Sequence, residues 1–142
     1  MTTEHRTARR TVAVPMAEPA PRAARELVRR TLHEVLRDDG RGMPAAVVDD
    51  AELAVSELVT NAVRHGGPPI ALRLVVTDDR VSIEVRDGGN GHPVLRRPDA
   101  DAVSGRGLAL VRAVAEEWGV RQDGAGKVVH ATLLLRRAPA AA

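Results

Sequence analysis

The 142-residue sequence predicts an α+β protein, a two-layer α/β sandwich in which three helices cover one face of a mostly antiparallel sheet. Two kinds of pattern indicate this fold class. Short segments with apolar residues at every second position follow one another across tight turns, which is typical of antiparallel hairpins. Three longer segments carry apolar residues at intervals of three and four positions, which is typical of helices with one buried face.

The N-terminal half predicts one strand and two helices. Residues 11–14 have the pattern of a short edge strand, and Pro15 is expected to close it. Apolar residues at helical spacing then predict a helix over residues 24–38. A longer helix is predicted over residues 44–65, where a Gly-Gly-Pro-Pro run ends it.

The C-terminal half predicts two hairpins and a third helix. In chain order we expect strands at 70–76 and 81–86, an irregular stretch at 88–104, a helix from Leu108 to about Glu117, and strands at 118–122 and 127–135. One domain is therefore predicted over residues 11–136. Residues 1–10 are expected to form a disordered arm and residues 137–142 a tail.

The composition excludes several classes of protein. The chain has no cysteine, which excludes a disulfide framework, a Cys-based zinc site and a Cys nucleophile. No apolar run approaches the ~20 residues of a membrane span, and the N-terminus lacks an apolar signal-peptide core, so we expect a cytoplasmic protein with no membrane partner.

The charge balance argues against a nucleic-acid partner. The sequence pI is about 10.3, yet 21 basic against 19 acidic residues leave a net charge of only +2. The positive excess lies in residues 1–37, where it fits the outer face of an amphipathic helix as well as a DNA contact. With one Trp and no Phe or Tyr, stacking on single-stranded bases is nearly excluded. We therefore expect no nucleic acid.

A polar stripe runs along the helix predicted over residues 44–65. Glu57, Asn61 and His65 are four positions apart and therefore share one side of the helix. Such a stripe is more often a solvated helix face than a site. Alternatively, the amide oxygen of Asn61 could hold Mg²⁺ while the carboxylate of Glu57 orients or deprotonates a nucleophile.

Asp87 ends the apolar row of the strand that precedes it. Counting by twos places its carboxylate on the same face as three apolar residues, so it points into the core and needs a donor. The alternative is that the strand has already ended and Asp87 begins an exposed Asp-Gly turn. Against this, the glycines of the run DGGNG at 87–91 exceed what one turn requires and would let a ligand approach the backbone.

The sequence Gly105-Arg106-Gly107-Leu108 opens the third predicted helix. Free N–H groups at the positive end of a helix are a natural seat for phosphate. Alone, this pair of glycines is equally consistent with a hinge between a loop and a helix. It matches neither a Walker A sequence nor a GxGxxG fingerprint.

Together, the segments ELVTNAVRHG, DGGNG and GRGL resemble the N box and the two glycine boxes of the Bergerat-fold (GHKL) ATPases. This superfamily includes gyrase B, heat-shock chaperones, histidine-kinase catalytic domains and mismatch-repair ATPases. The small size, the helix before the N box and the short lid are most similar to the RsbW/SpoIIAB-like branch of anti-sigma factor serine/threonine kinases. The resemblance covers about residues 11–136 and implies the Bergerat ATP-binding fold.

The resemblance implies a role for each matching residue. Asn61 would bind Mg²⁺ through its side-chain oxygen, Glu57 would be the general base, and Asp87 would accept a hydrogen bond from the adenine amino group of ATP. The rest of the implied ATP site comprises His65 at the entrance, Gly89 and Gly91 at the adenine pocket and lid hinge, Ser104, Gly105, Arg106, Gly107 and Leu108 at the phosphates, and Thr132 beside the adenine.

The resemblance also implies an activity and partners. It predicts a Mg-ATP-dependent serine/threonine kinase that holds a sigma factor inactive and phosphorylates a small anti-sigma factor antagonist; the family often pairs as homodimers. A non-catalytic ATP-binding regulator is the alternative, because Val103 stands where these kinases commonly have an arginine near the γ-phosphate. A histidine-kinase fragment is a weaker alternative, which rests on His33-Glu34 without the two-helix hairpin that presents a phosphoacceptor histidine.

Overall fold

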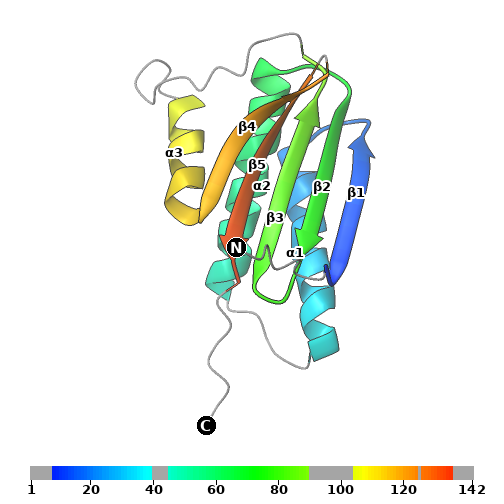
Figure 1. The fold of residues 1–142 in the computed structure, drawn as a ribbon, viewed down its shortest axis with the longest axis vertical. Coiled ribbons are helices and arrows are strands. Elements are labelled where there is room, and N and C mark those ends of the chain that lie inside the picture. Colours follow the sequence, from blue (N-terminus) through cyan, green and yellow to red (C-terminus); the bar gives the residue numbers. More distant parts are fainter. Residues whose placement is uncertain (1–7, 40–44, 90–103, 125, 136–142) are drawn as a thin grey trace, which may run out of the picture.

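A computed structural model of the protein describes residues 8–39, 45–89, 104–124 and 126–135. Its elements follow the order that the sequence predicts (Figure 1). They are β1 (Arg10–Met16), α1 (Pro21–Asp39), α2 (Ala45–His65), β2 (Ile70–Val76), β3 (Arg80–Asp87), α3 (Ser104–Val114), β4 (Glu117–Asp123) and β5 (Gly126–Leu134).

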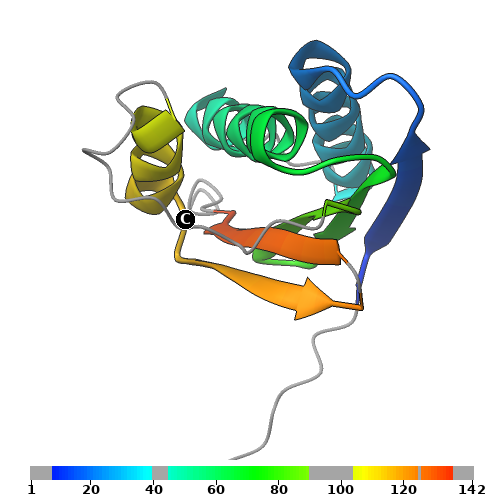
Figure 2. The same ribbon diagram turned by 90° about the horizontal axis from the view of Figure 1, so that it is seen from above.

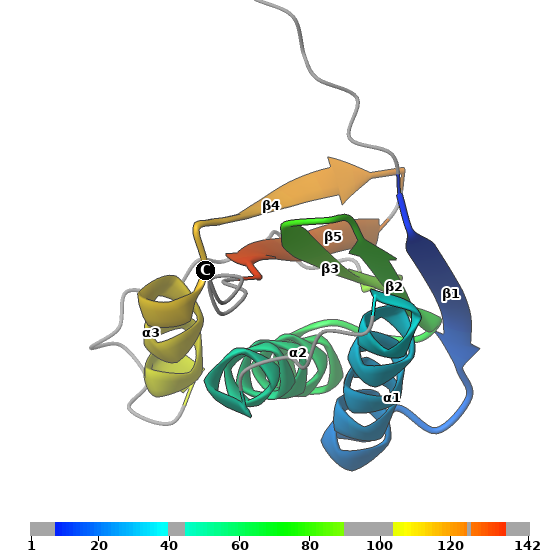
Figure 3. The same ribbon diagram turned by 90° about the horizontal axis from the view of Figure 1, so that it is seen from below.

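The strands form one sheet in the order β1-β2-β3-β5-β4, and every neighbouring pair is antiparallel. The three helices lie side by side on one face of this sheet (Figures 2 and 3). The predicted two-layer α/β sandwich is therefore confirmed. Among the described strands, β3 is central, β2 and β5 lie on either side of it, and β1 and β4 form the edges.

The core lies between the sheet and the helices. Along β3, the fully buried side chains Val81, Ile83 and Val85 alternate with residues of the uncovered face, such as Ser82 and Glu84. This alternation is the period-2 pattern that the sequence shows, so each central strand has an inner face toward the helices and an outer face. No described helix is long and apolar enough to cross a membrane.

Two polar contacts join α1 to α2. Arg25 donates a hydrogen bond of 2.9 Å to Ser56 Oγ, and Arg29 Nε lies 2.8 Å from Glu52 Oε1. The hydrogen bond to Glu52 is the main cause that raises the pKa of Arg29 above its ordinary value. One side of α2 is thereby fixed against α1, and the other side is turned toward α3.

The bounds of two predicted elements are wrong. The first strand begins at Arg10, which was expected to belong to a disordered arm, and it continues through Pro15 to Met16. Pro15 is tolerated because β1 lies at the edge of the described sheet and pairs with β2 alone, so a missing N–H costs little. The third helix begins at Ser104 and ends at Val114, instead of running from Leu108 to about Glu117. Glu116 N already bonds to Thr132 O, so the chain has joined the sheet by that point.

We expect Leu32→Ala to destabilise the protein strongly. Leu32 on α1 is 0% exposed, so its truncation leaves a cavity that should lower the free energy of unfolding by about 2–5 kcal/mol. Leu110→Ala on α3 is the matched control, because Leu110 is 44% exposed, and a change within about 0.5 kcal/mol is expected. Urea unfolding followed by circular dichroism measures both; equal losses would contradict this description of the core.

Candidate functional site

Four chain segments meet at one end of the sandwich. The C-terminal end of α2, the end of β3, the start of β5 and the N-terminal end of α3 all lie at the top of Figure 1. Two contacts join three of these segments: Gly88 N donates a hydrogen bond of 2.8 Å to Gly67 O, and Asp87 on β3 pairs with Lys127 on β5. The fourth segment, α3, packs against α2. The described parts of the three sequence motifs therefore lie at the same end of the domain.

Asp87 is buried at this end of the sheet. It is 1% exposed and lies on the inner face, in line with the apolar residues of β3. Its Oδ1 accepts a hydrogen bond of 3.0 Å from Gly89 N, which folds the backbone after the strand back over the carboxylate. The alternative of a solvent-exposed Asp-Gly turn is therefore excluded.

Lys127 is the counter-charge of Asp87, a partner that was not predicted from the sequence. Its Nζ lies 3.0 Å from Asp87 Oδ2, and both side chains are almost completely buried. This ion pair lacks hydrogen-bond geometry, so Oδ2 has no hydrogen-bond donor among the described residues. The alternation of the strand could have revealed this partner. Counting by twos along β5 places Lys127 on the same inner face as Val129 and Ala131.

Lys127 also connects the sheet to the helix layer. Its ammonium donates a long hydrogen bond of 3.5 Å to the carbonyl oxygen of His65, the last residue of α2. The predicted place of His65 near the site is consistent with this contact, although it is the main chain of His65 that makes it. The end of α2, β3 and β5 are thus held together through one buried ammonium group.

Glycines let the backbone close around the carboxylate. A Cβ added at Gly66 would lie 2.6 Å from Asp87 Oδ2, and one added at Gly89 would lie 2.8 Å from the carbonyl carbon of Gly66. Both distances are too short for a real Cβ. Gly89 is therefore required by packing against the chain after α2, independently of any ligand, and the predicted second glycine, Gly91, lies outside the described residues.

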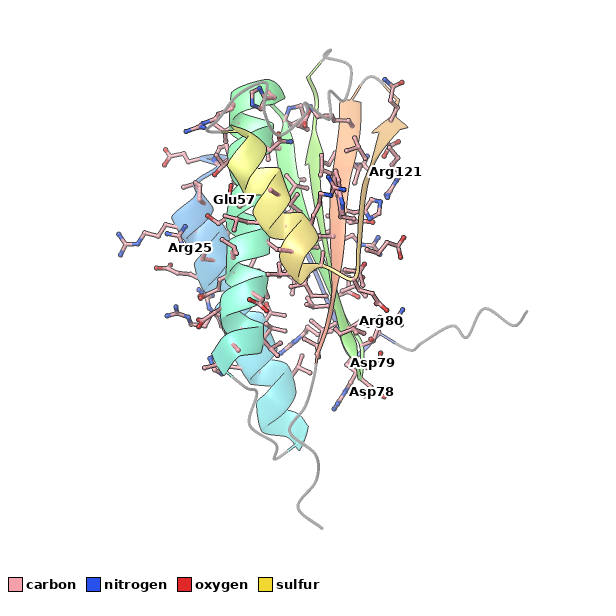
Figure 4. All side chains as sticks on the ribbon, turned by 90° about the vertical axis from the view of Figure 1, so that its left-hand side faces the viewer. Arg25, Glu57, Asp78, Asp79, Arg80 and Arg121 are labelled. Atoms are coloured by element: carbon pink, nitrogen blue, oxygen red, sulfur yellow. The ribbon has the colours of Figure 1, made fainter. Side chains whose placement is uncertain are left out.

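Glu57 and Asn61 lie on the side of α2 that is turned toward α3. Ala46 and Asp50, which occupy the same side of α2, line a groove of about 590 Å³ together with residues 113–116. Figure 4 shows Glu57 on the helical side of the sheet. Both side chains are half-buried and make no hydrogen bond or ion pair with another described residue. They are thus available to a group placed between α2 and α3.

The helix that carries the second glycine box begins earlier than predicted. Residues 104–107 form the first turn of α3, so Gly105 and Gly107 lie inside the helix. The first four N–H groups of a helix have no partner within it, and here they belong to this turn. The side chains of Ser104, Arg106 and Leu108 lie outside what the structure describes.

The structure contradicts the predicted place of Thr132 in the adenine site. Thr132 pairs with Ser82, and the two hydroxyl oxygens lie 3.2 Å apart on the outer face of the sheet. It is five positions from Lys127, which corresponds to about 17 Å along the strand. Strand register decides which residue of β5 meets Asp87, and that residue is Lys127.

These residues fit an adenine nucleotide. The acceptor Asp87 Oδ2 is buried and receives no hydrogen bond from the part of the chain that the structure describes, which suits an amino group. The N-terminal turn of α3 suits phosphate. No cluster of three or more His, Asp or Glu able to hold a metal occurs among the described residues. An Mg²⁺ ion at this place would thus take its ligands from Asn61, phosphate oxygens and water, as Mg²⁺ often does.

Comparison with known proteins identifies the family. The histidine kinase-like ATPase domain family matches residues 17–133. The chain belongs to this family. The expected resemblance to Bergerat-fold ATPases is thereby confirmed, and a histidine kinase-like ATPase domain implies ATP binding.

Individual relatives agree with this family. An anti-sigma F factor from Clostridium acetobutylicum is 33% identical over an alignment of 89 residues, which covers 54% of this chain and 62% of that protein. The match thus spans less than two thirds of the relative's length. This relative supports the anti-sigma branch of the histidine kinase-like ATPase domains.

Solved structures show the same fold. The RsbU and RsbW domains of a Mycobacterium tuberculosis protein align with 91% of this chain and 33% of that chain, with a TM-score of 0.62 and 23% identity. The histidine kinase domain of a blue-light activated kinase from Erythrobacter litoralis aligns with 79% of this chain and 61% of that chain, with a TM-score of 0.54 and 24% identity. At these identities the likeness establishes the fold of this histidine kinase-like ATPase domain.

We expect Gly66→Ala to destabilise this end of the domain. The new Cβ would collide with Asp87 Oδ2 and with the carbonyl oxygen of Ala62 at 2.7 Å, so the free energy of unfolding should fall by about 1–3 kcal/mol. Gly67→Ala is the matched control, because its nearest neighbour would lie 3.5 Å away. Urea unfolding compares the two variants; equal stability would show that Gly66 does not constrain the carboxylate.

Proposed function

We propose that this protein is a Mg-ATP-dependent serine/threonine kinase of the anti-sigma type. In this function it binds a sigma factor and phosphorylates a small antagonist protein. The observation that carries the ATP site is the buried carboxylate of Asp87, which lies between the end of α2 and the start of β5. One of its acceptor oxygens receives no hydrogen bond from any described residue. The anti-sigma F factor among its relatives supports the role.

Asp87 would select the base. An ionised carboxylate only accepts hydrogen bonds, so it matches the 6-amino group of adenine and repels the carbonyl oxygen of guanine. Because the site is buried, an unmatched polar group there is costly, and this cost gives the discrimination. Lys127 keeps the carboxylate electrostatically paired at this depth.

The phosphates would lie between α2 and α3. The N–H groups of the first turn of α3 would donate hydrogen bonds to phosphate oxygens, and the amide oxygen of Asn61 would coordinate Mg²⁺. The ion, when bound, neutralises charge on the phosphates during transfer. These assignments account for the position of Asn61 one turn before the end of α2, beside the helix that carries the second glycine box.

Glu57 would act on the substrate hydroxyl. It lies one turn before Asn61 on the same side of α2. Its carboxylate would take the proton of a serine or threonine hydroxyl as that oxygen forms its bond to the γ-phosphorus and the bond to the β-phosphate oxygen breaks, releasing ADP. The absence of a hydrogen bond to another described residue leaves the carboxylate available for this proton.

A second candidate function is an ATP-binding regulator without phosphoryl transfer. It is favoured by Val103, which leaves the position before Ser104 and Gly105 without the arginine that the resembled kinases commonly carry. A cation near the γ-phosphate contributes orders of magnitude to the rate of phosphoryl transfer. In this alternative, ATP would control the binding of the partner protein only.

We expect Glu57→Gln to abolish phosphoryl transfer while ATP binding persists. Losing a general base should lower the rate of transfer to a cognate antagonist at least ~100-fold. Asp50→Asn is the matched control, because Asp50 lies on the same side of α2, two turns earlier, and its replacement should leave the rate unchanged. Transfer of labelled γ-phosphate measures both. A normal rate in the Glu57 variant would remove it as the base, whereas no transfer by the wild type with intact ATP binding would favour the regulator.

We expect Asp87→Asn to lose ATP binding and stability together, because it leaves the ammonium of Lys127 buried without a counter-charge, a cost of about 3–5 kcal/mol. The double variant Asp87→Asn with Lys127→Met removes both charges and should recover most of the stability without recovering ATP binding. Thermal unfolding and calorimetry with Mg-ATP separate the two effects. ATP binding by the folded double variant at wild-type affinity would contradict the proposed site.

A further inference from the structure

We propose that Lys127 reads the base: its ammonium donates a hydrogen bond to ring nitrogen N1 of adenine, while Asp87 accepts one from the 6-amino group. The inference rests on the proposed ATP site and adds a specificity-determining residue to it. It assigns a recognition role to a side chain that would otherwise serve only to neutralise a carboxylate.

The position of Lys127 carries this inference. It is the cross-strand partner of Asp87, and both side chains belong to the inner face. Nζ and Oδ2 are 3.0 Å apart, so a donor and an acceptor lie side by side in the same buried place. Such a pair is complementary to a flat ligand edge that presents a donor next to an acceptor.

Both groups keep unused hydrogen-bonding capacity. An ammonium has three N–H donors, and the hydrogen bond of Lys127 to another described residue is the long one to His65 O, at 3.5 Å. The ion pair with Asp87 does not have hydrogen-bond geometry, and no other described residue donates to Oδ2. Buried polar groups in native proteins are normally hydrogen-bonded, so this pair is suited to a ligand that completes it.

The pattern matches adenine and opposes the 6-oxo purines. Adenine presents its 6-amino donor beside the acceptor N1, which complements a carboxylate beside an ammonium. Hypoxanthine and guanine present a carbonyl acceptor beside an N1–H donor. The carbonyl oxygen would then face the carboxylate of Asp87, and the N1–H would face the ammonium of Lys127. A site that holds buried polar groups discriminates strongly against a ligand that leaves them unpaired.

The choice of lysine at this place supports a role beyond charge balance. Lys127 is the single lysine among 21 basic residues, and the others are arginines. A planar guanidinium forms two parallel hydrogen bonds with a carboxylate and would occupy both acceptor oxygens. An ammonium is a point charge, which balances Asp87 and still leaves Oδ2 to accept from a ligand.

The decisive experiment combines a change in the protein with a change in the ligand. Calorimetry compares ATP with 1-deaza-ATP, in which ring N1 is replaced by C–H, for the wild type and for Lys127→Met. We expect the wild type to bind 1-deaza-ATP about 10- to 100-fold more weakly than ATP, as for loss of a hydrogen bond to a charged group. Lys127→Met should bind ATP more weakly and should distinguish the two ligands less than about twofold.

Two controls accompany this comparison. In 7-deaza-ATP the altered atom lies on the other ring of adenine, so its affinity should follow that of ATP in both proteins. Thr132→Val alters the same strand on its outer face and should keep the full preference for N1. A wild type that binds ATP but ignores the loss of N1 would overturn the inference and leave the proposed function standing. A wild type that binds neither nucleotide would overturn both.

A second measurement needs no variant, which matters if Lys127→Met does not fold. Because the chain has one lysine, selective ¹⁵N-lysine labelling gives a single side-chain ammonium signal. We expect this signal to shift on addition of Mg-ATP and to shift much less with 1-deaza-ATP at saturation. Equal shifts with the two nucleotides would show that the ammonium does not contact N1.

Discussion

The buried ion pair between Asp87 and Lys127 is the interaction on which the rest of the site depends. A carboxylate at the inner face of a central strand is stable only with a counter-charge, and the register of β3 and β5 supplies it. The same ammonium reaches the carbonyl oxygen of His65, so charge balance in the sheet also positions the end of α2. The proposed binding chemistry and the folding stability therefore depend on the same pair of side chains.

The helix layer divides its tasks around α2. Its contacts through Ser56 and Glu52 fix one side of this helix to α1. The opposite side, with Glu57 and Asn61, is turned toward α3. Because other residues of α2 hold this helix against α1, Glu57 and Asn61 are not needed for packing. Their side chains can therefore contact a ligand. The sheet end and this free side meet where α2 ends.

Periodicity predicts most of this fold, because apolar spacing reports directly which face of an element is buried. The three motifs and their convergence followed from the same reasoning, together with the family resemblance. Contacts that depend on strand register could not be predicted in this way. Lys127 was overlooked and Thr132 was chosen wrongly, because the pattern of one strand does not reveal which of its residues lies opposite Asp87. The start of α3 was misplaced because glycines in a first turn look like a loop.

The position of Lys127 in the site depends on the alternation of inward and outward side chains along β5. From Lys127 onward, every second residue of the strand faces the helices, and the residues between them face outward. The turn before it, where Gly124 has a φ of 62°, can change in length without altering that order. One residue inserted between Lys127 and the core residues that follow would send the ammonium to the opposite surface of the sheet and leave Asp87 alone in the interior. The domain can therefore vary its hairpin tip freely, whereas the first residues of β5 must keep their count.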